Sequence, residues 1–411
     1  MSTSTAPVSG IKLVKQAPPK DIYLDNHATT PLDPAVLQAI LPYLSENFGN
    51  PASTHSFGLR AQYAVEQARA QVAKAINALE EEIIFTAGAT ESNNFAIKGV
   101  FDHFRDRNPH FIVSNIEHKC ILEAVKHIEK QGAVVTVLEA DSQGLVSPSQ
   151  LENAIRPNTV LVSLMFANNE IGSVNPISKL AEVAHKHGAL FHTDAAQAVG
   201  KLPIDVKQLN IDLMSASGHK FYAPKGVGFV YVKKAAQELL TPLLDGGGQE
   251  SNLRSGTLNV PGIVGLGTAI ELATTDMGNQ LLHYLMLRNR LYSHLKSAFP
   301  DLILNGPDIV DATGLRASDI ASIAAQWKRL PHNLNITLPS IDSTKLARVY
   351  GLAFSSTSAC SSGDTKPSYV LIAIGRSIDE AKASLRFGVG RFNTESDVDQ
   401  AAHLLSSTLK A

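Results

Sequence analysis

Residues Ala189–Lys220 read ALFHTDAAQAVGKLPIDVKQLNIDLMSASGHK, and this stretch decides the fold class. It contains two short apolar runs, Ala189–Phe191 and Ile211–Met214, and polar residues follow each run. Helix-like sequence lies between them. A short apolar run, a helical segment and a second apolar run are typical of a βα unit, in which parallel strands are buried on both faces.

Apolar runs of the same kind recur from Asp21 to about Val232 and alternate with helix-like stretches. The other five runs are Ile83–Phe85, Phe111–Val113, Val134–Leu138, Val160–Met165 and Val227–Val232. With the two runs of the opening stretch they predict seven strands, and the alternation predicts a mostly parallel sheet. The expected fold class is therefore α/β.

The pattern changes after Pro261. A long helical stretch from about Val264 to Ala298 leads into a C-terminal part, where the strand-like segments Asn333–Leu338 and Ser384–Val389 alternate with helices. The N-terminus is rich in Ser, Thr and Pro. The predicted units are a mobile arm at residues 1–20, a large domain at 21–275 and a small α+β C-terminal domain at 276–411.

Composition and charge narrow the classes of function. The chain has 411 residues, of which 44% are hydrophobic and 18% are charged, a profile typical of a soluble globular protein. Its 36 Lys and Arg against 38 Asp and Glu give a formal charge of −2, so we expect a small-molecule ligand and no direct nucleic-acid binding. No apolar run reaches the about 18 residues that a membrane-spanning helix needs, so no membrane partner is expected.

The chain has only two cysteines, Cys120 and Cys360. Two cysteines exclude a disulfide framework and indicate a reducing compartment, so we expect a cytoplasmic protein. Cys120 stands beside His118 at a predicted helix start, and we expect it to be a buried thiol. Cys360 lies in a Ser, Thr, Gly and Asp segment with no apolar neighbours to bury it, which suits a reactive thiol.

Ligands of an open parallel sheet bind beyond the carboxyl ends of its strands. Asp194 follows one apolar run of the opening stretch, and Lys220 follows the other. Considered alone, Asp194 would be interpreted as a helix N-cap, and Lys220 as a solvent-exposed side chain. Together, a carboxylate that keeps a pyridine nitrogen protonated and an amine that can bind an aldehyde predict a site for pyridoxal 5′-phosphate (PLP).

Other polar residues at strand ends fit the same cofactor. The turn Gly88-Ala89-Thr90 opens a helix whose free N–H groups can hold a phosphate, although such a turn is also ordinary strand-to-helix punctuation. His118 can stack on an aromatic ring or simply start a helix. Gln197 lies one helical turn after Asp194 and can reach a ring hydroxyl. We predict no metal site.

With these residues assembled, the chain closely resembles the cysteine desulfurases of the class V aminotransferase superfamily from about Tyr23 to His403. The resemblance implies the PLP-dependent transferase fold of the aspartate aminotransferase type. The motifs that carry it are YLDNHATTPLDP (23–34), FGNPASTHSFG (48–58), FTAGATESNN (85–94), EHK (117–119), ANNEIG (167–172), HTDAAQAVGK (192–201), SGHKFYAPKG (217–226), RSGTLN (254–259) and SSTSACSSGDTKPSYVL (355–371).

The resemblance also implies roles for single residues. Lys220 resembles the lysine that holds PLP as a Schiff base, Asp194 the partner of the pyridine nitrogen, and His118 the histidine that stacks on the ring and aids proton transfer. The residues implied for the phosphate are Ala89, Thr90, Ser217, His219 and, from a neighbouring subunit of a homodimer, Thr257. Those implied for the ring hydroxyl and the substrate are Asn168 and Gln197, with Arg386 for the substrate carboxylate.

Cys360 determines the implied reaction. L-cysteine would lose its sulfur to the Cys360 thiol as a persulfide and leave as L-alanine, and the sulfur would pass to acceptors such as an iron–sulfur scaffold protein. The SACSSG loop resembles that of the long-loop, housekeeping-type group, which hands sulfur to several acceptors. Asp364 and Lys366 depart from the residues usual in this loop, and Ala223 stands where glycine is common.

Two other interpretations stay open at this point. One is a selenocysteine lyase, another PLP-dependent carbon–sulfur lyase or an aminotransferase of the same fold. The other is a non-catalytic scaffold or binding protein, against which the joint presence of Lys220, Asp194, Cys360 and Arg386 argues.

Overall fold

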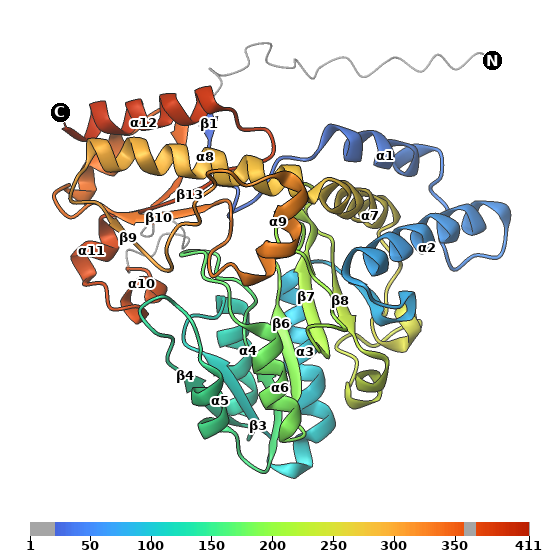
Figure 1. Cartoon of the computed structure of the whole chain (residues 1–411). Coiled ribbons are helices and arrows are strands. Elements are labelled where there is room, and N and C mark those ends of the chain that lie inside the picture. Colours follow the sequence, from blue (N-terminus) through green and yellow to red (C-terminus); the bar gives the residue numbers. More distant parts are fainter. Residues whose placement is uncertain (1–20, 357–366, 411) are drawn as a thin grey trace, which may run out of the picture.

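The computed structural model describes residues 21–356 and 367–410 of the chain. Figure 1 shows a large sheet with helices on both faces, and a smaller sheet that packs beside it under the long helices α8 and α12. The strands of the large sheet are β2 (Ile83–Thr86), β3 (His110–Ser114), β4 (Val134–Leu138), β5 (Thr159–Ser163), β6 (Leu190–Asp194), β7 (Leu213–Ser217) and β8 (Gly228–Val232).

The large sheet confirms the predicted architecture. Its seven strands lie in the order β2-β8-β7-β6-β5-β3-β4. Strand β8 runs antiparallel to both of its neighbours, and the other pairs are parallel. Each of the seven predicted apolar runs overlaps one of these strands. Runs such as FIV in β3 and VLV in β5 are apolar throughout because helices cover both faces of the sheet.

Helices connect the strands and cover the sheet. Those that precede α8 are α1 (Pro34–Ser45), α2 (Ser56–Ile76), α3 (Ala89–Phe104), α4 (Lys119–Glu129), α5 (Pro148–Ala154), α6 (Ile177–Lys186) and α7 (Val260–Thr275). Local sequence sets several of their ends. At the start of α1, for example, Asp33 accepts a hydrogen bond from the backbone N–H of Ala35, and Pro34 occupies a first-turn position where no N–H is needed.

The long helical stretch predicted near residues 264–298 is two helices, α7 and α8 (Met277–Ala298), which meet at the non-helical residue Asp276. Helix α7 packs against α1 and α2, whereas α8 packs against α12 (Glu395–Lys410) and α9 (Ala317–Ile323). Gly278 allows α9 to approach, because a Cβ there would lie 2.3 Å from the Ala317 carbonyl oxygen. The predicted boundary near residue 275 lies at this break between the two helices.

The small sheet has the order β12-β13-β10-β9, and all of its pairs are antiparallel. Its members are β9 (Ile303–Leu304), β10 (Asn333–Thr337), β12 (Ser355–Ser356) and β13 (Ser384–Gly388), and the short helices nearby are α10 (Tyr369–Ala373) and α11 (Ile378–Lys382). Both predicted C-terminal strands are therefore confirmed. The first described residues join this part of the molecule, because β1 (Ile22–Tyr23) pairs with β11 (Leu352–Ala353).

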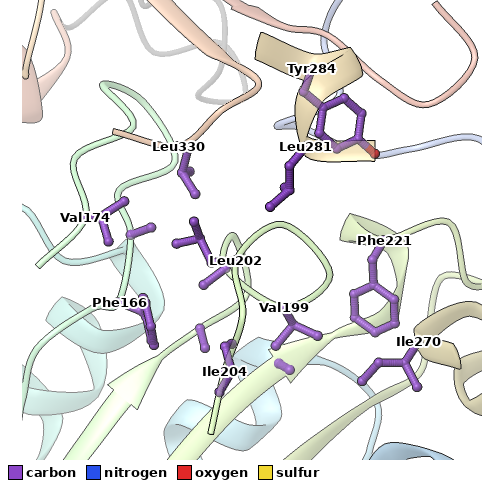
Figure 2. Packing of buried hydrophobic residues seen from close by; sticks show 14 of the residues in the cluster. Phe166, Val174, Val199, Leu202, Ile204, Phe221, Ile270, Leu281, Tyr284 and Leu330 are labelled. Atoms are coloured by element: carbon purple, nitrogen blue, oxygen red, sulfur yellow. The ribbon is translucent and has the colours of Figure 1, made fainter. Parts of the chain in front are cut away.

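One apolar core joins the two sheets. Figure 2 shows Leu281 and Tyr284 of α8 on the side of Leu330, facing large-domain residues such as Leu202 and Phe166. This shared core fixes the first described residues and the small sheet against the carboxyl edge of the large sheet. In the described ranges, no helix combines the length and the apolar character required to cross a membrane.

Candidate active site

The carboxyl ends of neighbouring strands form one edge of the large sheet, and a cavity of about 840 Å³ opens there. Strands β6 and β7 are parallel, and Asp194 pairs with Ser215, so β7 continues two residues further and ends at Ser217 on the same edge. Predicted site residues that line the cavity are Ala89, Thr90, His118, Asp194, Gln197, Ser217, His219 and Lys220. The strand order thus brings together residues that are more than one hundred positions apart in the sequence.

Lys220 ends a short 3₁₀ turn, Gly218–Lys220, that follows β7 directly. Its Nζ atom donates hydrogen bonds to the carbonyl oxygens of His27 (2.7 Å) and Ala28 (2.8 Å). The segment before α1 therefore holds the amine at the cavity wall. Ala223, where glycine is common, closes the turn through a bond from its N–H to the Gly218 carbonyl (3.1 Å), so alanine is tolerated there.

Asp194 is held in one orientation. Its Oδ2 atom accepts a hydrogen bond from the Asn93 side-chain amide (2.7 Å), and its Oδ1 atom accepts one from the Ala196 backbone N–H (2.9 Å). The carboxylate is almost fully buried but still lines the cavity. Fixed by two donors, it can accept a further hydrogen bond from a protonated ring nitrogen inside the cavity.

The predicted phosphate turn lies at the start of α3, a helix of 16 residues. Gly88 precedes the helix with a φ of +145°, a conformation that essentially only glycine adopts. A Cβ at Gly88 would point at Ser217 and lie 3.2 Å from its Oγ atom. Ala89 and Thr90 bring the free N–H groups of the first helical turn to the cavity, so a phosphate fits between this turn, Ser217 and His219.

Substituting Gly88 by alanine should weaken PLP binding by roughly tenfold or more. The new side chain forces the backbone out of a glycine-only conformation, at a cost of about 1–3 kcal/mol, and occupies space in the cradle. Absorbance titration of cofactor-free protein with PLP measures the dissociation constant. Gly132→Ala is the matched control, because Gly132 also has positive φ but meets nothing within 4 Å. Equal dissociation constants for the two variants would contradict a phosphate cradle at Gly88.

His118 caps α4 and lines the cavity. Desolvation by the surrounding protein lowers its pKa, an effect that the Asp194 charge opposes and the Lys220 charge reinforces. The imidazole is therefore neutral near pH 7 and can accept a proton. Cys120, expected to be buried, instead lines the cavity beside it at half-buried exposure. Burial raises the pKa of the Cys120 thiol to about 12, so it stays protonated and weakly nucleophilic.

Asn168 does not line the cavity, and here the structure corrects the expectation. Its side-chain amide donates to the Ile116 carbonyl (3.0 Å), and its Oδ1 atom accepts from the backbone N–H groups of Glu170 (2.8 Å) and Ile171 (3.0 Å). These bonds fold the turn after β5 and use up the amide. The neighbouring Asn169 lines the cavity instead.

Arg386 lies on β13 at the margin of the site and does not line the cavity. It is 5% exposed, and its Nη2 atom pairs with Asp25 Oδ1 (2.9 Å) while Nη1 donates to the Asn169 carbonyl (3.2 Å). The guanidinium therefore contacts Asn169, which lines the cavity, but does not line the cavity itself. Thr257 lines a different cavity of about 470 Å³, between α2, β2 and the loop around Glu250.

Cys360, Asp364 and Lys366 lie outside the described residues, but the flanking residues contact the site. Before the segment, Ser355 Oγ donates to Asp25 (2.9 Å) and accepts from Arg386 (2.8 Å). After it, Tyr369 donates from its hydroxyl to the Glu117 carbonyl (2.6 Å), next to His118. Both described flanks of the Cys360 segment are thus fixed beside the cavity.

Three residues of the site were not identified from the sequence: His27, Asn93 and Asn169. His27 lies in YLDNHATTPLDP and Asn93 in FTAGATESNN, motifs for which the sequence indicated no role at these positions. His27 contacts Lys220 and Gln197, and Asn93 contacts Asp194. Asn169 differs from Asn168 only by one position in a turn, so side-chain direction could not be read from the pattern.

The residues present fit PLP. The cavity offers an amine for the aldehyde carbon, a fixed carboxylate for the ring nitrogen and a glycine-lined helix start for the phosphate. Gln197 lines the same cavity, and its side-chain amide can donate a hydrogen bond to a ring hydroxyl there. Among the described residues, no group of three or more His, Cys, Asp or Glu side chains is arranged to hold a metal ion.

The chain is similar to known proteins both in sequence and in fold. Residues 22–401 match the model of the class V aminotransferase family. The chain is 44% identical over 390 residues to cysteine desulfurase IscS of Rickettsia akari, a match that covers 94% of this chain and 91% of the relative. A solved NifS-like protein has a TM-score of 0.84 at 34% identity and covers 95% of this chain and 99% of its own. SspA in complex with cysteine has a TM-score of 0.76 at 37% identity, over 90% and 99% of the two chains.

Proposed function

Since the chain belongs to the class V aminotransferase family and is, within it, a PLP-dependent cysteine desulfurase, we propose that Cys360 receives the sulfur of L-cysteine and passes it on. The acceptors would serve iron–sulfur cluster assembly and other sulfur-containing products. The observation that carries the proposal is the convergence of Lys220 and Asp194 in one cavity, with the two flanks of the Cys360 segment fixed beside it.

PLP, when bound, supplies an electron sink for the bonds around the substrate Cα. Lys220 would hold the cofactor, and its Nζ atom can carry a proton to and from the substrate. Asp194 keeps the proton on the ring nitrogen. His118, neutral because its pKa is lowered, can take a proton at the cavity wall.

Arg386 is the proposed partner of the substrate carboxylate. Its planar fork suits two parallel hydrogen bonds to a carboxylate, and Asp25 and Ser355 fix its orientation at the cavity margin. Arg386 also donates a hydrogen bond to the carbonyl of Asn169, and Asn169 lines the cavity. The substrate carboxylate would therefore lie between Arg386 and Asn169.

The sulfur step involves the Cys360 thiolate. It attacks the substrate sulfur, so that a sulfur–sulfur bond forms while the carbon–sulfur bond breaks. The electron pair of the broken bond stays with the three-carbon product, which takes up a proton and leaves as L-alanine. The proposal is tested by supplying the PLP-loaded protein with L-cysteine and a reducing thiol, where equal amounts of alanine and sulfide support it and no alanine refutes it.

A homodimer is part of the same proposal. Large apolar side chains are exposed on α1, α2 and the loop between them: Leu37, Leu41, Leu44, Phe48, Phe57, Leu59 and Tyr63. The cavity that contains Thr257 is lined in part by the same loop and by α2. Such an apolar surface is typical of an interface between subunits, and a second copy would bring Thr257 toward the phosphate cradle of its partner.

Replacing Leu41 and Leu44 together by glutamate should convert the dimer into monomers. Two buried charges at an apolar interface are costly, and loss of the partner's threonine should also weaken PLP binding by roughly tenfold. Light scattering after size-exclusion chromatography measures the mass. Met286→Glu is the control, since Met286 is similarly exposed on α8. A monomeric wild-type protein with full PLP affinity would rule out the dimer.

A cytoplasmic location and an iron–sulfur scaffold acceptor complete the proposal. With two cysteines, the sequence lacks the disulfide framework that is typical of small secreted proteins, which favours a reducing compartment. The acceptor would approach the side of the molecule where β12 and α10 flank the Cys360 segment, because sulfur must pass directly from that thiol.

A further inference from the structure

His27 lies between the cavity and the small domain, and its side chain is fully buried. Its ring stacks on the ring of His332, with 4.3 Å between centroids. The small domain also confines it through β13, because a Cβ at Gly388 would lie 2.8 Å from His27 Cδ2. The imidazole therefore has one fixed place and one fixed orientation.

His27 contacts two of the predicted cofactor residues at once. Its Nδ1 atom lies 2.9 Å from Gln197 Oε1, and its carbonyl oxygen accepts from Gln197 Nε2 (3.0 Å). The same carbonyl accepts from Lys220 Nζ (2.7 Å). Through these bonds, His27 fixes the Gln197 amide on both of its polar atoms and the Lys220 amine on one side.

The neighbours determine which ring nitrogen of His27 carries the proton. Gln197 donates with Nε2, so it presents its oxygen to His27, and Nδ1 must be the donor. On the other side, Asn333 Nδ2 lies 3.1 Å from His27 Nε2, while Asn333 Oδ1 accepts from Arg329 (2.7 Å). Nε2 is therefore an acceptor, and the imidazole is neutral with its hydrogen on Nδ1.

The charged groups around His27 favour the same state. Burial lowers its pKa well below the usual value, and the positive charges of Arg386, Lys220 and Lys201 act in the same direction. The second imidazole, His332, is also fully buried, and burial lowers its pKa as well. A proton on His27 Nε2 would face the N–H₂ group of Asn333, so the neutral form persists through the pH range of a cell.

We propose that His27 is a positioning residue that fixes the Gln197 amide so that its second N–H points into the cavity, toward an anionic oxygen on the ring of the cofactor. The Gln197 oxygen and one N–H are used by His27, which leaves one N–H of that amide for the cavity that Gln197 lines. This inference rests on the proposed placement of PLP against Asp194 and Lys220. A donor to the ring oxygen stabilises its negative charge and so favours release of the proton that the oxygen shares with the Lys220 nitrogen.

The test compares His27→Leu with His27→Asn. Leucine fills the space but cannot donate to Gln197, whereas the asparagine amide can replace the Nδ1–H donor. Both variants lose the stack on His332, so their difference isolates the hydrogen bond. The pH at which the absorption spectrum of the PLP-loaded protein changes should rise by roughly one unit in His27→Leu and by less than about a third of a unit in His27→Asn.

Two further measurements make the result decisive. Gln197→Leu should cause the same rise, and combining it with His27→Leu should add nothing, because both act through one hydrogen bond. In the cofactor-free protein, ¹⁵N NMR of the histidine side chains should show the Nδ1–H tautomer for His27, assigned by its loss in His27→Asn. Equal spectral shifts in the two His27 variants, or an Nε2–H tautomer, would overturn the inference. A wild-type protein without any PLP absorption band would instead refute the proposed cofactor site.

Discussion

Replacing Lys220 by alanine should reduce alanine formation from L-cysteine by at least about 10³-fold. The substitution removes the amine that holds PLP and the group proposed to carry a proton to and from the substrate, and each role alone is worth roughly 10²–10⁴-fold in enzymes. Lys220 lines the cavity in the turn after β7, with its Nζ atom 2.7 Å from the His27 carbonyl. Activity is measured as alanine released per protein at saturating L-cysteine.

The same variant has a second, spectroscopic signature. Without the amine, PLP can bind only through its phosphate and ring contacts, so the absorption band of the lysine-linked cofactor should disappear while reduction with borohydride fixes no PLP to the protein. Lys207→Ala is the control, because Lys207 is exposed and remote from the cavity. Borohydride fixation of PLP to another lysine in Lys220→Ala would show that the assignment is wrong.

Replacing Cys360 by alanine should also lower alanine formation by at least about 10³-fold but should leave the PLP absorption band intact. The persulfide mechanism needs a thiolate to remove the sulfur, and the second cysteine of the sequence, Cys120, stays protonated because burial raises its pKa to about 12. Cys360 is not among the residues proposed to bind the cofactor, so the spectrum separates a lost nucleophile from a lost cofactor site.

Cys120→Ala is the matched control for this experiment. The Cys120 thiol accepts a hydrogen bond from Asn93 (3.1 Å) and contacts His118, so its loss should change activity by no more than about threefold. Full activity of Cys360→Ala would restore the interpretation of the chain as a different PLP-dependent lyase. A full loss in Cys120→Ala would transfer the sulfur-accepting role to that residue.

The sequence predicted the large sheet, and the edge of it at which Asp194 and Lys220 lie, because both follow from local rules. Apolar runs buried on two faces identify parallel strands, and the carboxyl ends of such strands form the ligand edge. Asp194 and Lys220 follow two such runs, and the structure places their strands, β6 and β7, next to each other. Any parallel arrangement brings these ends to the same edge, but it is the strand order that makes them neighbours.

What the sequence could not predict depends on contacts between distant segments. The Lys220 amine is held by carbonyl groups 192 and 193 residues earlier in the chain, and Arg386 is paired with Asp25. No period or turn signal encodes such pairs. The choice between Asn168 and Asn169 failed for a local reason, because the bonds that fold a turn decide which side chain is left for the cavity.

The break between α7 and α8 was missed for a related reason. Apolar residues continue at helical spacing through Asp276, so periodicity alone predicts one helix. The two helices separate because each packs on a different domain, and Gly278 lets α9 approach the start of α8.

Mass spectrometry of the protein after brief treatment with L-cysteine tests the central claim most directly. The account predicts one additional sulfur atom on the peptide that contains Cys360, with alanine in solution in equal amount, and neither product in Lys220→Ala. Normal alanine formation without added sulfur on that peptide, or added sulfur on the Cys120 peptide alone, would contradict it.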